Sequence, residues 1–198
     1  MVSQDRMIDL LEKYGEQASK KYGQHYLINK DVITQGIKSL GLDDDVVLEI
    51  GPGLGFITDQ LSKRASKVIA IEKDPNLVQI LEKEYDWGNV EVIKGNILDS
   101  DLPKFNKIFS NVPFQISSDL ITKFQEMEFE KAILILQRGF AEKILDKGER
   151  RTRLSILTQS RFNLSILRGI RKSSFFPKPK INASLVEFEK KENSLNSK

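Results

Sequence analysis

Short apolar runs alternate with amphipathic segments along almost the whole of this 198-residue sequence. The apolar runs are candidate strands at 46–50, 67–71, 90–93, 107–110, 131–136, 162–167 and 184–189. Helical periodicity lies around and between them at 31–40, 56–64, 75–84, 117–126, 140–146 and 152–160. Because strands separated by helices pair in parallel, the pattern predicts an α/β fold with a seven-stranded, mostly parallel sheet wrapped by helices.

The last strand pair and the two ends of the chain depart from this alternation. Only the proline-containing stretch 173–180 separates the last two strands, so we expect them to form an antiparallel hairpin at one edge of the sheet. Residues 3–20 predict a charged amphipathic helix outside the core. We therefore divide the chain into a helical extension at 1–20, a main domain at 21–190 and a flexible polar tail at 191–198.

A glycine-rich loop follows the first of these strands. Gly51, Gly53 and Gly55 lie between a buried strand and a helix, and glycine lets the backbone turn sharply and approach a ligand closely. Glu72 ends the second strand, 21 residues after Gly51, where a carboxylate can accept hydrogen bonds from both hydroxyls of a ribose. The loop and the carboxylate together indicate a nucleotide-type ligand.

The spacing of the glycines favours S-adenosylmethionine (SAM) over NAD. A dinucleotide loop reads G-x-G-x-x-G, whereas this loop reads G-x-G-x-G and has Phe56 at the place of the third glycine. A bulky Phe argues against a pyrophosphate at the helix N-terminus, and SAM has no phosphate. A seven-stranded sheet with an antiparallel last strand is also the class I SAM-dependent methyltransferase architecture, which is Rossmann-like. After the third strand, Asn96 can accept a hydrogen bond from the adenine amine of SAM and Ile97 can pack on its ring, although an ordinary turn also explains this segment.

The tetrapeptide Asn111-Val112-Pro113-Phe114 follows the fourth strand, at the sheet edge where ligands of open α/β folds bind. The side-chain carbonyl of Asn111 and a backbone carbonyl near Val112 can accept both hydrogens of an exocyclic amine, which aims the nitrogen lone pair at a methyl group. Phe114 can stack on the base, and Phe176 is a candidate for its opposite face, with core packing as the alternative. Positioning then supplies most of the acceleration, so the motif predicts methylation of adenine N6 in a single-stranded or flipped base.

The charge distribution supports a nucleic acid as the partner. From Arg138 to Lys180 there are twelve Lys and Arg against three Asp and Glu, a net charge of +9, whereas the rest of the chain carries −6. A basic region on an otherwise acidic protein suggests a surface that binds a polyanion, with a merely solvated surface as the alternative. The candidate phosphate contacts are Arg150, Arg151, Arg153, Lys178 and Lys180.

Composition excludes other classes of site. The chain has no cysteine and one histidine, so we expect neither disulfides nor a metal site. No apolar run approaches the roughly 18 residues of a membrane span, and the N-terminus does not have the form of a signal peptide. We therefore expect a cytoplasmic monomer that does not contact membranes.

Four segments, read together, resemble the rRNA adenine N6-dimethyltransferase family: 23–27, 49–53, 111–114 and 176–180. The resemblance covers about 21–189 and implies that 21–190 is a SAM-dependent catalytic domain that dimethylates adenines in rRNA. In the small-subunit branch the targets are two adjacent adenines near the 3′ end, and the partner is rRNA or the small ribosomal subunit. The resemblance implies a target base near Phe114 and Phe176. The cofactor residues that we predict are Gln24, His25, Leu27, Gly51, Gly53, Glu72, Asn96, Ile97 and Asn111.

The chain departs from the family pattern in several places. Asn96 stands where the family usually has Asp, His25 where it has Asn, and Phe114 where it has Tyr. Family members also carry a small helical domain after the last strand, whereas this chain stops at Lys198. Two alternatives remain open: an adenine methyltransferase for another nucleic acid, and a non-catalytic RNA-binding ribosome-assembly factor that keeps the fold.

Overall fold

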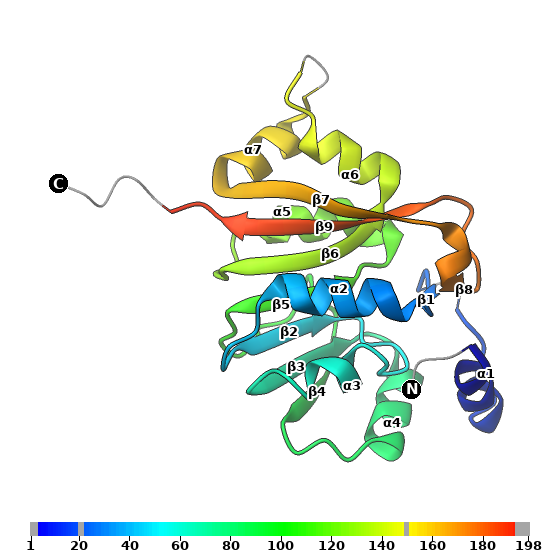
Figure 1. The fold of residues 1–198 in the computed structure, drawn as a ribbon. Helices are drawn as coiled ribbons and strands as arrows, with labels where there is room; N and C mark the ends of the chain where they lie inside the picture. The colour runs from blue at the N-terminus through cyan, green and yellow to red at the C-terminus, as the bar shows by residue number, and fades with distance from the viewer. Residues whose placement is uncertain (1–3, 20–21, 149–150, 193–198) are drawn as a thin grey trace.

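The computed structural model describes residues 4–19, 22–148 and 151–192, and a seven-stranded sheet forms its centre (Figure 1). In spatial order the strands are β4 (Val90–Lys94), β3 (Lys67–Glu72), β2 (Val46–Ile50), β5 (Lys107–Asn111), β6 (Lys131–Gln137), β9 (Ala183–Lys190) and β7 (Phe162–Ile170). The pairs from β4 to β6 are parallel, and β9 runs antiparallel to both of its neighbours. The predicted α/β fold is confirmed, and so are the antiparallel last strand and its hairpin with the edge strand β7.

Helices cover both faces of this sheet. Successive strand residues point to opposite faces, so Ile133 and Ile135 of β6 belong to one core cluster and Leu134 and Leu136 to the other. One face packs against α2 (Lys30–Leu40), α3 (Thr58–Leu61) and α4 (Pro75–Glu84), and the other against α5 (Ser117–Lys123), α6 (Arg138–Leu145) and α7 (Arg153–Arg161). In Figure 1, α2 lies in front of the sheet and α5 behind it. Within the described residues, no helix is long and apolar enough to cross a membrane.

Local signals explain where the helices begin and end. The Asn29 side chain accepts hydrogen bonds from the first backbone N–H groups of α2, and Gly41 ends that helix in the left-handed region with a φ of 63°. Asp74 caps α4 in the same way, with Pro75 in the first turn. The helix predicted at 56–64 is shorter than expected, because Gly55 has a φ of 79° and the chain turns before α3 begins.

The N-terminal helix α1 (Gln4–Lys13) packs on the core, so the prediction that it lies outside the core is wrong. Its apolar residues Met7, Leu10 and Leu11 follow helical spacing and are almost completely buried in the same cluster as α2 and α4. The helix also ends earlier than predicted, because Gly15 has a φ of 62°. The end of the predicted flexible tail, 193–198, lies outside the described residues.

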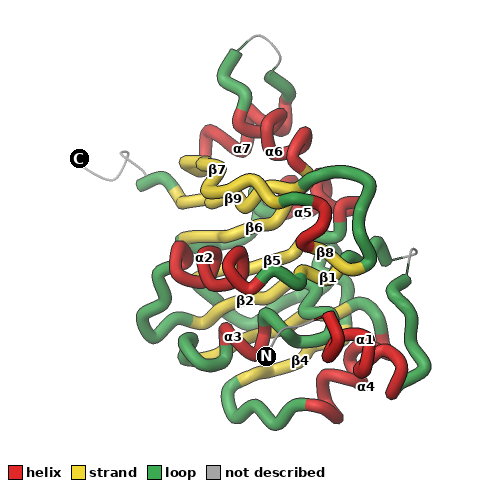
Figure 2. Tube along the Cα trace, turned by 45° about the vertical axis from the view of Figure 1, so that its right-hand side comes forward, coloured by secondary structure: helices red, strands yellow, loops and turns green. Residues whose placement is uncertain are grey.

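A second, two-stranded sheet was not predicted. It pairs β1 (Tyr26–Leu27) with β8 (Phe175–Phe176) in antiparallel register, Tyr26 opposite Phe176. In both views the pair lies beside the edge of the main sheet where the parallel strands end (Figures 1 and 2). It therefore brings a segment that precedes the first parallel strand next to a segment that follows β7.

Candidate active site

A pocket of about 1140 Å³, part of it open to solvent, lies at the carboxyl edge of the parallel strands. Its walls come from the segments that follow β2, β3, β4 and β5 and from the segment around β1. Eleven of the predicted site residues line this one pocket: Gln24, His25, Leu27, Gly51, Gly53, Glu72, Asn96, Ile97, Asn111, Pro113 and Phe114. Sequence positions far apart therefore converge on one site.

The glycine loop needs its glycines for two reasons. Gly53 has a φ of 60°, a backbone conformation that residues with a side chain rarely adopt. A Cβ at this position would also lie 3.0 Å from the ring of Tyr26, which packs directly over the loop. The loop thus presents bare backbone to the pocket, with the buried Tyr26 closing it on one side.

Glu72 ends β3 with its carboxylate held by the backbone. Oε2 accepts a hydrogen bond from the Gly53 N–H at 3.1 Å, and Oε1 accepts one from the Asp74 N–H at 2.9 Å. Burial raises the pKa of this carboxyl, and hydrogen bonds from backbone N–H groups, those of Asp74 and Gly53 among them, counteract only part of that rise. The two fixed bonds orient the carboxylate at the pocket wall and leave it capacity to accept further hydrogen bonds.

Gln24 secures the segment that forms the opposite wall. Its Oε1 accepts hydrogen bonds from the Ser19 N–H at 2.7 Å and from the Tyr26 hydroxyl at 3.1 Å. Its Nε2 donates to Oδ2 of Asp74 at 2.9 Å. The Gln24 amide therefore connects the wall around β1 to the turn that carries Glu72.

Asn96 lies in a tight turn that also forms part of the pocket wall. Its Nδ2 donates to the Asp99 carboxylate, and its Oδ1 accepts a long hydrogen bond of 3.4 Å from the Leu98 N–H. Ile97 beside it is buried. The segment is therefore an ordinary turn, as the alternative predicted, and its residues Asn96 and Ile97 also line the pocket.

Asn111 ends β5 with its amide in a defined orientation. Its Nδ2 donates to the backbone carbonyl of His25 at 2.7 Å. Because a carbonyl can only accept, the NH₂ group must face His25, and Oδ1 is left as the acceptor on the other side of the amide. Phe114 begins the 3₁₀ helix η1 (Phe114–Ile116) in the same pocket, with its ring centroid 6.1 Å from that of His25.

Phe176 reaches the site indirectly. It is half-buried and pairs with Tyr26, but it is not among the residues that line the pocket. The next residue, Pro177, accepts a hydrogen bond through its carbonyl from Nδ1 of His25 at 2.7 Å. Phe175, the residue before Phe176, is buried in the core.

The predicted phosphate-binding residues do not form one patch. Lys178 and Lys180 are exposed in the connection between β8 and β9, directly after Phe176. Arg151 and Arg153 are exposed at the start of α7, and α7 stands away from β8 in both views (Figures 1 and 2). Arg150 lies outside the described residues.

Sequence reasoning missed two residues that shape the pocket. Asp74 fixes both Glu72 and Gln24, and it had a readable signal, because an Asp before a Pro directly after a strand is a typical helix start. Tyr26 packs on the glycine loop, and its sequence context gave no such signal.

The sheet order, the glycine loop and the carboxylate at the end of the next strand together define a class I methyltransferase fold. Comparison with known proteins narrows this class. The family model for ribosomal RNA adenine dimethylase matches residues 15–198. This chain belongs to the ribosomal RNA adenine dimethylase family.

Individual relatives agree with this assignment. A probable ribosomal RNA small subunit methyltransferase A from Thermococcus onnurineus is 46% identical over 193 residues, which are 96% of this chain and 71% of the relative. The dimethyladenosine transferase of Plasmodium falciparum superposes with a TM-score of 0.80 and 31% identity, covering 84% of this chain and 64% of that one. The 23S rRNA methyltransferase ErmE gives a TM-score of 0.77 and 27% identity, covering 85% and 70%.

Proposed function

We propose that this protein transfers methyl groups from SAM to the N6 atoms of adenines in ribosomal RNA, with two adjacent adenines near the 3′ end of the small-subunit RNA as the target. The observation that carries the proposal is the fixed amide of Asn111, whose acceptor oxygen lies in the same pocket as the glycine loop and Glu72. The names of the Thermococcus and Plasmodium relatives support the substrate.

The residues of the pocket suit SAM, which the family and the fold imply as the methyl donor. When bound, SAM supplies a methyl group that is already activated by its positive sulfur. The bare backbone around Gly53 accommodates close approach, and a Cβ there would meet Tyr26. Glu72 would hold the ribose hydroxyls, while Asn96 and Ile97 would contact the adenine of the donor.

The part of the pocket around Asn111 and Phe114 suits the amine that would accept the methyl group. Oδ1 of Asn111 and a backbone carbonyl near Val112 would accept the two hydrogens of the adenine amine, which orients the nitrogen lone pair toward the methyl group. Phe114 would stack on the base, and Phe176 would approach its other face. The amine needs no strong base, because its proton can pass to water after the transfer, so geometry supplies most of the acceleration.

The exposed cations beside Phe176 suit the RNA backbone. Arg171, Lys172, Lys178 and Lys180 are all exposed in the connection between β7 and β9. Within the described part of the chain, none of these four side chains is in an ion pair. Their charge is thus available to the phosphates that flank the target adenine.

The direct test is to incubate the protein with labelled SAM and small ribosomal subunits that lack adenine methylation. We expect N6,N6-dimethyladenine in the 3′-end loop, identified by nuclease mapping and mass spectrometry. Parallel reactions with large-subunit RNA, tRNA and DNA would show whether another nucleic acid is preferred. Calorimetry with SAM distinguishes an enzyme from a non-catalytic ribosome-assembly factor. A protein that binds no SAM and labels no RNA would be such a factor.

A further inference from the structure

We propose that His25 is a positioning residue that ties the amide of Asn111 to the loop that carries Phe176, an inference that rests on the proposed function. The residue makes two contacts with different parts of the site. Its backbone carbonyl accepts from Nδ2 of Asn111 at 2.7 Å, and its ring nitrogen Nδ1 contacts the Pro177 carbonyl at 2.7 Å. One residue thus connects the group that would hold the amine to the segment that would cover the base.

The first contact belongs to the backbone and does not depend on the side chain. It fixes which end of the Asn111 amide faces the pocket, and any residue at position 25 could provide it. The second contact depends on the imidazole alone. Since the Pro177 carbonyl can only accept, Nδ1 must carry a proton and donate it.

The position of Pro177 explains why a side chain is needed here. The antiparallel pairing of β1 with β8 ends at Tyr26 and Phe176. In this register the backbone groups of position 177 point away from β1, so no backbone N–H of β1 reaches the Pro177 carbonyl. The Pro177 carbonyl therefore finds its donor in the His25 ring. Within the described residues, the next residue along this loop that makes a hydrogen bond is Asn182.

The consequence is that the His25 ring marks the last hydrogen-bonded point before the basic stretch of the loop. Without it, Phe176 would keep its pairing with Tyr26, but the chain beyond it would lose its hydrogen bond to the pocket wall. The imidazole also lies beside Phe114, with 6.1 Å between ring centroids. His25 therefore sets how the two candidate stacking rings stand relative to Asn111.

Two variants of nearly equal shape isolate the contact. His25→Asn places an amide nitrogen at the position of Nδ1 and keeps the donor, whereas His25→Leu has the same branched shape and no donor. At saturating SAM we expect the kcat/KM for RNA of His25→Leu to be about fivefold to tenfold lower than that of His25→Asn. Because His25 is also one of the predicted cofactor residues, the Kd for SAM of both variants is measured by calorimetry, and the difference between the variants in kcat/KM should exceed any difference in Kd.

A double-mutant cycle with Phe176→Ala tests the route of the effect. If His25 acts through the loop, His25→Leu should cost little in the Phe176→Ala background. Equal rates for the Asn and Leu variants, or an unchanged loss in that background, would overturn the proposal.

Hydrogen–deuterium exchange of the free protein gives a readout that needs no activity. Peptides covering 175–182 should exchange faster in His25→Leu than in the wild type or His25→Asn, while peptides from β5 stay unchanged. Similar exchange in all three proteins would show that the hydrogen bond from His25 to the Pro177 carbonyl does not order this loop. An inactive wild type with the expected exchange pattern would instead reject the proposed function and leave the tie in place.

Discussion

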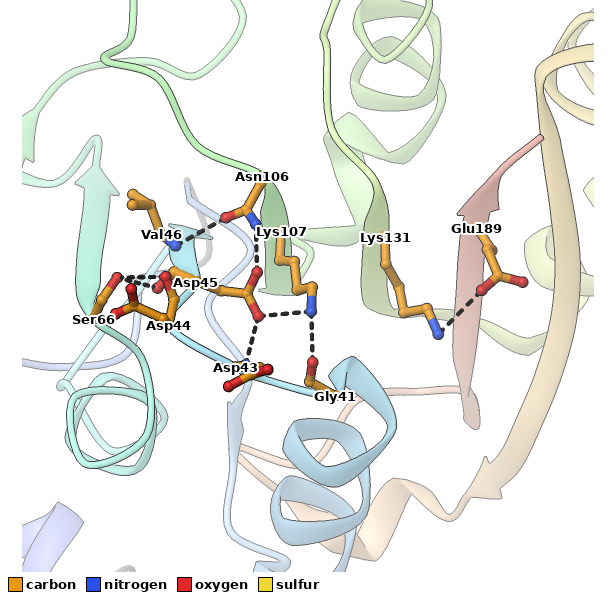
Figure 3. A network of polar contacts seen from close by, with 10 residues as sticks. All are labelled: Gly41, Asp43, Asp44, Asp45, Val46, Ser66, Asn106, Lys107, Lys131 and Glu189. Carbon is orange, nitrogen blue, oxygen red and sulfur yellow. Dashed lines mark hydrogen bonds and ion pairs between the residues drawn. The ribbon is translucent and has the colours of Figure 1, made fainter. Parts of the chain in front are cut away.

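Polar groups at the amino ends of the parallel strands, here called the amino edge, and at their carboxyl ends, the carboxyl edge, form hydrogen bonds of two different kinds. At the amino edge, Asp45 accepts hydrogen bonds from Nζ of Lys107 at 2.6 Å, from the Asp43 N–H at 2.8 Å and from Nδ2 of Asn106 (Figure 3). At the carboxyl edge, Glu72 and Asn111 are each held from one side by backbone groups and face the pocket with the other. The Asp45 carboxylate uses its hydrogen bonds to join neighbouring elements. Glu72 and Asn111 are held in place by part of their hydrogen-bonding capacity and keep the rest for a ligand.

The amino-edge network closes on itself. Lys107 also donates to the carbonyl of Gly41, which ends α2, and Oδ1 of Asn106 accepts from the Val46 N–H at 2.8 Å (Figure 3). Burial alone would raise the pKa of Asp45, but the hydrogen bonds from Lys107, the Asp43 N–H and Asn106 hold it below its ordinary value. The network thus fastens α2, β2 and β5 at the end of the sheet away from the pocket.

The largest effect is expected at the carboxyl edge, from Asn111→Ala. Losing the acceptor for the amine should lower kcat/KM by about 10² to 10³-fold, as removal of one fixed polar group from a transition state commonly does. SAM affinity should fall much less than kcat/KM, and the melting temperature should change little, because the glycine loop and Glu72 are untouched. Steady-state kinetics with calorimetry would measure both, and unchanged activity would disprove the assigned role.

Breaking the amino edge should have the reverse signature. Lys107→Met removes one partner of a largely buried pair, whose side chains are 12% and 6% exposed. We expect the free energy of unfolding in urea to fall by roughly 3 kcal/mol, with kcat of the folded protein unchanged. Lys63→Met is the matched control, because it breaks an equally short but exposed pair with Asp59 and should cost less than about 1 kcal/mol. A large loss of kcat in Lys107→Met would contradict the view that the amino edge contributes to stability and not to catalysis.

Glu49 on β2 sharpens the comparison, because it is a buried carboxyl without the partners of Asp45. Its Oε2 has no hydrogen-bond partner among the described residues, and burial raises its pKa to about 8. The unfolded chain releases this proton near pH 4.5, so the stabilising effect of the neutral form is lost as the pH rises from there toward 8. Relative to Glu49→Gln, the wild type should lose about 2 to 3 kcal/mol over two pH units within that window, as urea unfolding would measure. Parallel stability curves for the two proteins would show that Glu49 is ionised in the fold.

The smallest effect concerns the free cations of the carboxyl edge. Lys178→Ala and Lys180→Ala should each reduce the slope of log Kd for RNA against log salt by about 0.7. Lys131 is the control, because it sits at the amino edge in ion pairs with Glu187 and Glu189 and its removal should leave the slope unchanged. Filter binding between low and moderate salt would measure the slopes, and equal slopes in all variants would place the RNA elsewhere.

Sequence reasoning recovered the parts of the molecule that depend on local patterns. The strands, their mostly parallel pairing and the pocket residues at strand ends all follow from periodicity and from the positions of the glycines and carboxylates. It did not recover contacts set by tertiary packing: the burial of Met7 in α1 and the pairing of Tyr26 with Phe176. Such contacts join segments far apart in the chain, and neither segment carries a local sign of its partner. The roles assigned to the pocket residues remain predictions.

The place of β9 between β6 and β7 has a consequence for synthesis, because both neighbours precede it in the chain. A nascent chain can assemble β2 to β5, with the glycine loop and Glu72, while β7 still has no neighbour to pair with. The stretch that bears Phe176 acquires a fixed second end only when Ala183–Lys190 emerges and inserts. Long-range pairings of this kind form late. A newly made molecule should therefore complete the glycine loop and the Glu72 wall of the pocket before the segment that bears Phe176 is fixed.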